Sequence, residues 1–327
     1  MNLYPLVKLL SDGQPHSGTE LGQKLGISRT AIWKQIQKLP ELGLTYRSDK
    51  QKGYSLSAPL DLLDPGYLEQ ALQSSEGLNG CELFFEPVIT STNTFLLDRV
   101  NSGEPIHKSL AVAEMQSSGK GRRGKSWFSP FGYSLSCSLG WQFEGSAQEL
   151  QGMSLAIAVA LKNALEGLGI QGIGLKWPND LYLQDAKLIG VLIEISGDLS
   201  GPCQLVVGFG VNVYRPQQLD AECIDQPASF LSDLGSLLPS RNDLVVAMNL
   251  AVANVLTRFA NDGFQPWQAA WNEAHLWDNK PGWVIAGEHK EAVTLHGVND
   301  QGELRVTLED GSEKHLNSGE ISVRLKA

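Results

Sequence analysis

The sequence predicts an α/β (α+β) protein in which a central mixed sheet stands between a small helical head and a short all-β tail. Residues 1–60 carry apolar side chains at helix spacing, followed by two short strand-like runs. Strand-like and helix-like segments are mixed over residues 65–277, which is typical of a sheet covered by helices. Residues 278–327 hold only short strand-like runs separated by turns rich in Asp and Gly.

The chain length agrees with this division. With 327 residues, the chain has room for two domains and a small third one. We therefore predict domains at residues 1–60, 65–277 and 278–327, joined at the first boundary by a linker over residues 59–65. The tail is predicted to close into a small SH3-like β-barrel, because short strands with tight turns bury an apolar face most simply in that way.

The head has the pattern of a winged helix-turn-helix. A first helix ends at Asp12 and Gly13, a second spans residues 20–25, and Gly26 makes the turn. Ser28 is the expected N-cap of a third helix, which buries isoleucines four residues apart. Two short strands, at 45–47 and 53–56, flank a basic turn and form the wing.

Cations gather on the exposed side of this head. Residues 1–60 hold eight Lys or Arg against four Asp or Glu, whereas the rest of the chain holds 18 against 32. The residues expected to contact DNA are Ser28, Arg29, Thr30, Lys34, Lys38, Lys50 and Lys52. The alternative is a helical module for protein contacts with a solvated cationic face. The charge and the wing favour DNA, bound by two copies at paired half-sites.

In the body, the expected strands lie at 82–88, 110–115, 134–141, 175–177, 188–195 and 204–211. The expected helices lie at 93–100, 148–168, 243–260 and 267–277. No apolar run approaches ~18 residues, no secretion signal is visible at the N-terminus, and the four cysteines have no close spacing. These features exclude a zinc or disulfide framework and predict a cytoplasmic protein without a membrane partner.

The segment 119–126 (Gly-Lys-Gly-Arg-Arg-Gly-Lys-Ser) matches the P-loop pattern letter for letter. A P-loop requires a helix directly after it, because the helix N-terminus completes the phosphate site. Here a turn-rich stretch and then an alternating Ser/apolar run follow, which predicts a half-buried strand instead. The three glycines and four cations favour a loop that binds anions over a solvated turn.

Four further clusters have polar residues next to apolar strands. Residues 90–93 (Thr-Ser-Thr-Asn) are either a helix N-cap or a set of small donors and acceptors for an uncharged ligand. Residues 176–180 (Lys-Trp-Pro-Asn-Asp) form either a turn or a site at the end of a strand. Lys187 marks either the solvated end of a strand or a ligand for an anion. The two glycines of 208–212 (Gly-Phe-Gly-Val-Asn) are expected to let a flat ligand approach the backbone.

Together these features resemble the family of bifunctional biotin–protein ligases that also repress the biotin operon. The resemblance extends over essentially the whole chain. It rests on the winged head, the motifs 91–93, 119–125, 127–130, 176–180 and 208–212, and the single residues Gln116 and Lys187. Each motif alone is weak, and their combination is specific.

The resemblance implies a role for each matching residue. The biotin pocket would be formed by Ser91, Thr92, Asn93, Gln116, Lys120, Gly121, Arg122 and Lys187. The nucleotide would be bound by Arg123, Lys125, Trp127, Asn179 and Asn212. Arg122 and Lys187 would be catalytic, and Asp180 would support Mg²⁺. Lysines stand at 120 and 125, where family loops often have arginine, so the charge is kept but two-pronged binding is lost.

The resemblance also implies the reaction and its partners. Biotin and ATP would form biotinyl-5′-adenylate with Mg²⁺, and biotin would pass to a lysine of the biotin carboxyl carrier protein of acetyl-CoA carboxylase. The adenylate-bound homodimer would bind operator DNA. The alternatives are a biotin ligase whose head does not bind DNA, and a related lipoate-type ligase, which would leave the winged head unexplained.

Overall fold

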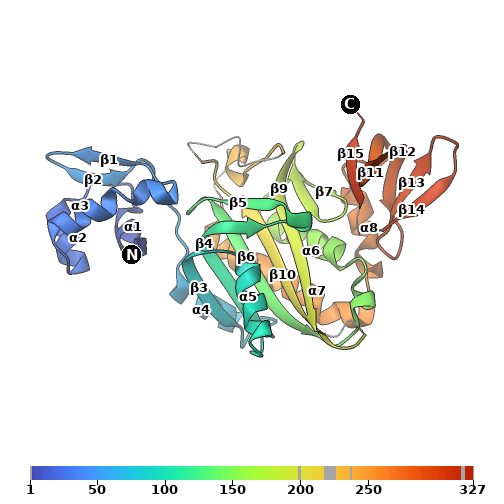
Figure 1. Ribbon diagram of the computed structural model, residues 1–327, viewed down its shortest axis with the longest axis horizontal. Coiled ribbons are helices and arrows are strands. Elements are labelled where there is room, and N and C mark those ends of the chain that lie inside the picture. The colour runs from blue at the N-terminus through green and yellow to red at the C-terminus, as the bar shows by residue number, and fades with distance from the viewer. Residues whose placement is uncertain (1, 198–199, 217–225, 236–237, 318–320, 327) are drawn as a thin grey trace.

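The computed structural model describes residues 2–197, 200–216, 226–235, 238–317 and 321–326. The head lies at one end of the molecule, the large sheet in the middle and the tail at the other end (Figure 1). The elements of the head are α1 (Tyr4–Leu10), α2 (Gly18–Leu25), α3 (Arg29–Ile36), the 3₁₀ turn Leu39–Leu42, β1 (Tyr46–Asp49) and β2 (Gly53–Leu56).

Capping and burial explain the helices of the head. The hydroxyls of Ser17 and Ser28 accept hydrogen bonds from the first turns of α2 and α3. Gly26 ends α2 in the left-handed conformation, with a φ of 67°. Ile32 and Ile36 of α3 are fully buried, as expected from their spacing. All the residues expected to contact DNA are exposed, in agreement with the predicted winged helix-turn-helix.

The central domain is built on one eight-stranded mixed sheet. Its strands are β3 (Glu82–Ile89), β4 (Ser109–Lys120), β5 (Ser126–Ser129), β6 (Ser134–Phe143), β7 (Ile173–Lys176), β8 (Asp180–Leu183), β9 (Ala186–Gly197) and β10 (Cys203–Asn212). They are ordered β3-β4-β6-β10-β9-β8-β7, with β5 paired to β4. Only β3 and β4 are parallel, which confirms the predicted mixed sheet.

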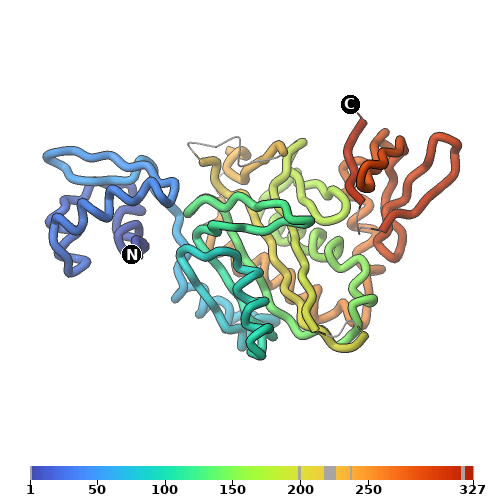
Figure 2. The backbone as a smooth tube through the Cα atoms, viewed as in Figure 1, coloured from blue at the N-terminus to red at the C-terminus, as the bar shows by residue number. Residues whose placement is uncertain are grey.

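Helices cover both faces of this sheet. They are α4 (Pro65–Ser74), α5 (Thr92–Asn101), α6 (Met153–Gly167), α7 (Arg241–Asp262) and α8 (Gln265–Ala274), with short 3₁₀ turns at Ala147–Leu150 and Leu231–Leu234. Leu110 and Val112 of β4 join the main core with α6 and α7, whereas Ala111 joins the smaller core under α5. This alternation places α5 alone on the face opposite α6 and α7, as the tube in Figure 2 shows.

Three expectations about local structure are wrong. The stretch after the basic loop contains β5 rather than only turns, because β4 continues to Lys120 and pairs with it. The 176–180 run begins with the last residue of β7 and ends with the first residue of β8, and α4 follows the linker; neither β8 nor α4 was among the expected elements. The serines of β6 are buried instead of facing water, because α5 and β5 cover their side of the strand.

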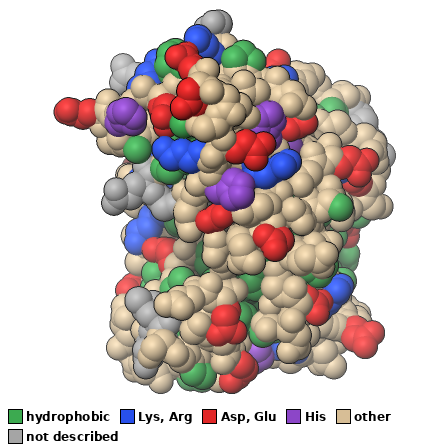
Figure 3. Space-filling view, turned by 90° about the vertical axis from the view of Figure 1, so that its right-hand side faces the viewer, with side chains coloured by type: hydrophobic (Ala, Val, Ile, Leu, Met, Phe, Trp, Pro, Cys, Tyr) green, Lys and Arg blue, Asp and Glu red, His purple; other side chains and the backbone are tan. Residues whose placement is uncertain are grey.

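The tail is a five-stranded antiparallel sheet, consistent with the predicted small SH3-like barrel. Its strands are β11 (Lys280–Ala286), β12 (His289–Val298), β13 (Leu304–Leu308), β14 (Glu313–Leu316) and β15 (Ile321–Leu325), in the order β14-β13-β12-β11-β15. Figure 3 views the molecule from this end and shows acidic side chains spread over the surface.

A buried ion pair joins the linker to the body. Glu114 of β4 and Arg241 of α7 are fully buried, with Oε2 and a guanidinium nitrogen 2.6 Å apart. The other oxygen of Glu114 accepts a hydrogen bond from the backbone N–H of Leu63 at 2.7 Å. Arg241 also donates to the carbonyls of Asp61 and Ser134. The linker is therefore held by charged groups that have no contact with water.

The helix α7 is long and apolar enough to cross a membrane on length and composition alone. Half of its most apolar window is buried inside the protein, however, and core helices meet the same criterion. Its first residue, Arg241, lies in the buried ion pair described above. We therefore describe α7 as a core helix.

Candidate active site

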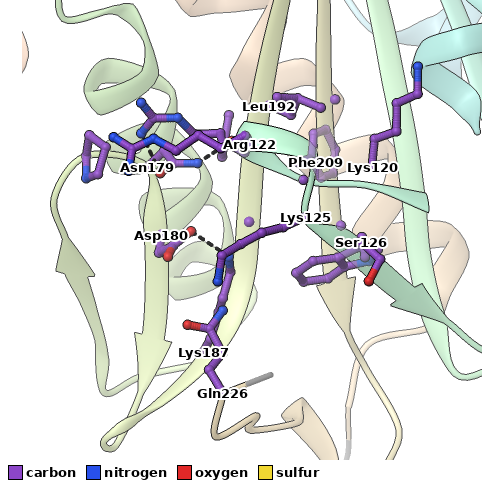
Figure 4. A pocket seen from close by; sticks show the side chains of 18 of the residues that line it. Lys120, Arg122, Lys125, Ser126, Asn179, Asp180, Lys187, Leu192, Phe209 and Gln226 are labelled. Atoms are coloured by element: carbon purple, nitrogen blue, oxygen red, sulfur yellow. Dashed lines mark hydrogen bonds and ion pairs between the residues drawn. The ribbon is translucent and has the colours of Figure 1, made fainter. Parts of the chain in front are cut away.

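A cavity of about 1090 Å³, counting its open mouth, lies where the β4–β5 hairpin faces the ends of β7, β8 and β9. Strand β15 of the tail closes one side through Ile321, Val323 and Arg324. Figure 4 shows that its labelled side chains come from the basic loop, from the 176–180 run, from β9 and β10, and, for Gln226, from the segment between β10 and the 3₁₀ turn Leu231–Leu234. Every residue expected to bind biotin lines this cavity.

The polar end of the cavity is formed where α5 begins. Ser91 is the N-cap of α5, so the structural interpretation of this residue is confirmed. The backbone N–H and hydroxyl of Thr92 both donate to the side-chain oxygen of Gln116, at 2.8 and 3.1 Å. Ser138 of β6 lies 2.7 Å from the Thr92 hydroxyl. The sequence did not indicate a role for Ser138, because it is one of several serines that alternate with apolar residues and were expected to face water.

Asn93 is held in place from two sides. Its amide nitrogen donates to Glu194 of β9 at 2.7 Å, and its oxygen accepts from Ser138 at 2.6 Å. A side chain at Gly208 would collide with the Asn93 oxygen, and one at Gly210 would collide with the Trp127 ring. The glycines of 208–212 thus make room for side chains of this chain. Both glycines also line the main cavity, so the expectation that they let a flat ligand approach the backbone stays a prediction.

The basic loop is the turn of the β4–β5 hairpin. Arg123 has a φ of 57° and Gly124 a φ of 72°, so the turn passes through the left-handed region twice. No helix follows Ser126, and the rejection of a P-loop is therefore confirmed. Arg122 crosses the cavity and donates to the side-chain oxygen of Asn179 at 3.2 Å. Lys120 extends away from this contact (Figure 4).

A pair of opposite charges also lines the cavity. The Nζ atom of Lys187 is 2.8 Å from a carboxylate oxygen of Asp180, and both side chains are mostly buried. The same ammonium group lies 5.5 Å from the centre of the Trp127 ring, within range of a cation–π interaction. The structure therefore brings Arg122 into the same cavity as Asp180 and Lys187, although Arg122 and Lys187 are 65 residues apart in the sequence.

The cavity favours anions. Burial lowers the pKa of Arg122, and the neighbouring Arg123 lowers it further. Burial also lowers the pKa of Lys176 to about 8, and the nearby cations Arg324, Lys187 and Lys125 contribute to the shift while Asp180 opposes it. A bound anion would relieve this repulsion between cations, because an opposite charge favours the protonated forms.

Lys176 and Arg324 were not among the predicted site residues. The Nζ atom of Lys176 donates to the Tyr182 hydroxyl at 3.0 Å and lies 4.9 Å from the centre of the Trp277 ring. The 176–180 run was predicted to be a possible site, but its sequence does not show that Lys176 is buried. Arg324 comes from the tail, and nothing in the local sequence there indicated that β15 reaches the cavity.

Asn212 lies outside the main cavity, in a smaller one that shares Ser126, Trp127 and Lys187 with it. The amide nitrogen of Asn212 donates to the backbone oxygen of Lys187 at 3.3 Å. The indole N–H of Trp127 is buried and has no hydrogen-bond partner among the described residues. A buried donor without a partner is costly, which makes this wall a suitable place for a ligand acceptor.

Among the described residues that line the main cavity, Asp180 is the one with a carboxylate side chain. Within the described ranges, no group of three or more His, Cys, Asp or Glu gathers as a metal centre would require. The thiols of Cys81, Cys137 and Cys203 are free, and Cys223 lies outside the described residues. The site thus contains no preformed cage for a tightly bound metal.

Three family models match successive parts of the chain. They are an HTH domain over residues 3–55, the biotin/lipoate A/B protein ligase family over 85–212, and the biotin protein ligase C terminal domain over 286–324. Over 319 residues, the chain is 37% identical to the bifunctional ligase/repressor BirA of Salmonella typhimurium, covering 98% of this chain and 96% of that protein. The chain belongs to the family of bifunctional biotin ligase/repressors. The BirA of Escherichia coli matches with the same identity and coverage.

A solved structure of another biotin protein ligase supports this family assignment. The biotin protein ligase of Aquifex aeolicus, in complex with biotin and ATP, matches with a TM-score of 0.63 and 26% identity. The match covers 75% of this chain and 99% of that one. The predicted fold, enzyme class and substrates are thereby confirmed. The lipoate-type alternative finds no support among these relatives, which match over 91% or more of their length and are named bifunctional ligase/repressors.

Proposed function

We propose that this ligase carries out both steps of biotin transfer in the main cavity. In the first step, a carboxylate oxygen of biotin attacks the α-phosphorus of ATP, and diphosphate leaves. In the second, the ε-amine of an acceptor lysine attacks the carbonyl carbon of the mixed anhydride, an amide forms and AMP leaves. The main support for this proposal is that one cavity contains uncharged polar side chains at one end and several cations at the other.

The uncharged end is suited to the ureido group of biotin. Thr92, Asn93 and Gln116 present hydroxyl and amide groups, with Ser91 and Ser138 beside them. These side chains are fixed by one another and by Glu194, so they are oriented before a ligand arrives. We assign them to the biotin head, together with Lys120 and Gly121 of the basic loop.

The cation-rich end is suited to the reacting groups. Both reactants of the first step are anions, and their approach requires positive charge where negative charge develops. Arg122 and Lys187 face the same space from opposite walls, and we assign them the catalytic roles. We assign Arg123, Lys125, Trp127, Asn179 and Asn212 to the nucleotide, because Trp127 lines both cavities and its buried indole N–H has no partner within the described ranges.

Asp180 fits a magnesium ion that arrives with ATP. Mg²⁺ is commonly held by one or two carboxylates together with substrate phosphates and water, so a single carboxylate facing the phosphate end suffices. When bound, the ion would neutralise phosphate charge. In its absence, Asp180 stays paired with Lys187, which orients that lysine toward the cavity.

The acceptor, the cellular location and the domain limits are part of the same proposal. We assign as acceptor the biotin carboxyl carrier protein of acetyl-CoA carboxylase, in the cytoplasm and without a membrane partner. Free thiols in the described cysteines and the burial of α7 support this location. We place the three domains at residues 1–60, 65–277 and 278–327, in agreement with the separate sheets of the wing, body and tail.

We propose that adenylate binding promotes a homodimer that binds operator DNA. Within the described residues, the outer half of β9 pairs only with β10, since its pairing with β8 ends at Gly190. Ile195 of this half is 39% exposed. An open strand edge with apolar side chains readily pairs with a second strand, and a two-fold dimer would pair the same edge from both copies. Two heads would then contact two half-sites.

A gel-shift assay tests the DNA-binding part of this proposal. A duplex selected by the protein from a random pool should be retarded, and more strongly when biotin and ATP are both present. The physical reason is that two linked heads bind paired half-sites far more tightly than one. Lack of retardation with and without biotin and ATP would leave a ligase whose head does not bind DNA.

A further inference from the structure

Trp33 is the most exposed large apolar side chain in the described part of the chain. Its side chain lies on α3 and is 51% exposed, whereas the isoleucines at 32 and 36 on the same helix are fully buried. Among the described residues, no other ring packs against its indole and no cation lies over it. Folding of the head therefore does not explain why a large aromatic residue stands at this position.

The neighbours of Trp33 form an exposed row along α3. Arg29 and Gln37 lie four residues before and after it, and side chains at this spacing are neighbours on a helix surface. Lys34 and Thr30 are exposed beside the row. The first turn of α3 carries no acidic residue, and the wing adds the exposed cations Lys50 and Lys52. The indole is thus an apolar centre within a cationic surface.

This combination of charge and apolar area fits the major groove of DNA. In a helix-turn-helix, the second helix of the motif enters the major groove and its first residues reach base edges. Here that helix is α3, and Trp33 is its fifth residue. The flanking cations suit phosphates, which fix the position of the helix but carry no sequence information. The apolar feature that a major groove offers is the methyl group of thymine.

We propose that Trp33 is a specificity-determining residue of the DNA-binding surface, which recognises thymine through the contact of its indole ring with the C5 methyl group. The proposal rests on the DNA-binding part of the function proposed above. Arg29 and Lys34 position α3 on the backbone, and Trp33 supplies the contact that distinguishes thymine from cytosine. Because the contact is apolar, it is insensitive to salt, in contrast to the phosphate contacts around it.

The test replaces thymines of a selected duplex, one at a time, by deoxyuridine, which removes only the methyl group. For the wild-type protein with biotin and ATP, one or two positions in each half-site should lose about threefold to fivefold in affinity, as burial of one methyl group predicts. Trp33→Ala should bind the unmodified duplex about tenfold more weakly. It should show no further loss at those same positions, because the contact is already absent.

Matched variants separate this role from general effects. Tyr67 of α4 is also strongly exposed, at 47%, and Tyr67→Ala should leave the deoxyuridine pattern unchanged. Trp33→Ala should retain wild-type ligase activity, which shows that the chain is folded. Lys34→Ala should weaken binding to all duplexes and reduce its salt dependence.

Two results would overturn the proposal in distinguishable ways. If the wild-type protein binds a selected duplex but Trp33→Ala keeps the full deoxyuridine pattern, Trp33 does not recognise thymine, and the repressor function stands. If the wild-type protein retains no duplex at all, the DNA-binding function fails together with the role of Trp33, while the ligase assignment is unaffected.

Discussion

Replacement of Lys187 by methionine is expected to slow formation of the adenylate by about a hundredfold to a thousandfold, the usual cost of losing one group that stabilises charge in a transition state. Lys187 is mostly buried, faces the cavity and is held 2.8 Å from Asp180. Methionine keeps the length and apolar stem of the side chain but removes the charge. The measurement is a single-turnover assay of adenylate formation with biotin and ATP both saturating.

Two variants control for indirect effects of this change. Lys162 of α6 forms an ion pair with Glu166 outside the cavity, so Lys162→Met should form the adenylate at the wild-type rate. Asp180→Asn removes the partner carboxylate but leaves Lys187 charged. Adding Lys187→Met to this variant removes the ammonium group without leaving an unpaired carboxylate, so the double variant shows how much of the loss in Lys187→Met comes from that carboxylate. Adenylate formation by Lys187→Met within about threefold of wild type would mean that Lys187 does not stabilise the reacting charges.

Replacement of Glu114 by alanine is expected to destabilise the central domain by about 3–5 kcal/mol, because it leaves the charge of Arg241 buried without a partner. The same change removes the acceptor for the Leu63 backbone N–H in the linker. Both side chains are 0% exposed, so solvent cannot replace the lost partner. Urea unfolding, followed by tryptophan fluorescence, measures the shift in the free energy of unfolding.

A surface ion pair gives the matched comparison. Lys314 and Glu291 lie 3.2 Å apart on the exposed side of the tail, and Glu291→Ala should cost less than about 1 kcal/mol. A comparably small loss for Glu114→Ala would show that Arg241 reaches water or another partner when Glu114 is absent. Because Glu114 lies two residues before Gln116 on β4, the variant should also weaken biotin binding, which isothermal titration can detect.

Much of the fold was predictable because its causes are local. The spacing of apolar residues predicts the buried faces of α3 and β9. Ser28 and Ser91, as N-caps, predict where α3 and α5 begin. The basic loop was also recognisable, since an alternating strand pattern after it is incompatible with a P-loop helix. These patterns depend on neighbours within a few residues, which a single sequence shows directly.

The remaining features depend on contacts between distant segments. Glu114 and Arg241 are separated by 127 residues, and neither has a local pattern that indicates burial. Arg324 reaches the cavity only because the tail packs beside the 176–180 run. The serines of β6 looked solvent-exposed because their spacing is that of a half-buried strand, whereas α5 and β5 cover them. Such contacts are determined by the tertiary fold, and the spacing of residue types along the sequence does not indicate them.

The most direct test of the central claim is mass spectrometry of a carboxyl carrier domain incubated with this protein, biotin, ATP and Mg²⁺. The mass of the carrier should increase by one biotinyl group, and a carrier with its acceptor lysine replaced by arginine should stay unmodified. The gain should require both biotin and ATP, because the amide forms only through the adenylate. An unchanged carrier mass, under conditions in which another biotin ligase modifies the same carrier, would contradict the assignment of this cavity as a site of biotin transfer.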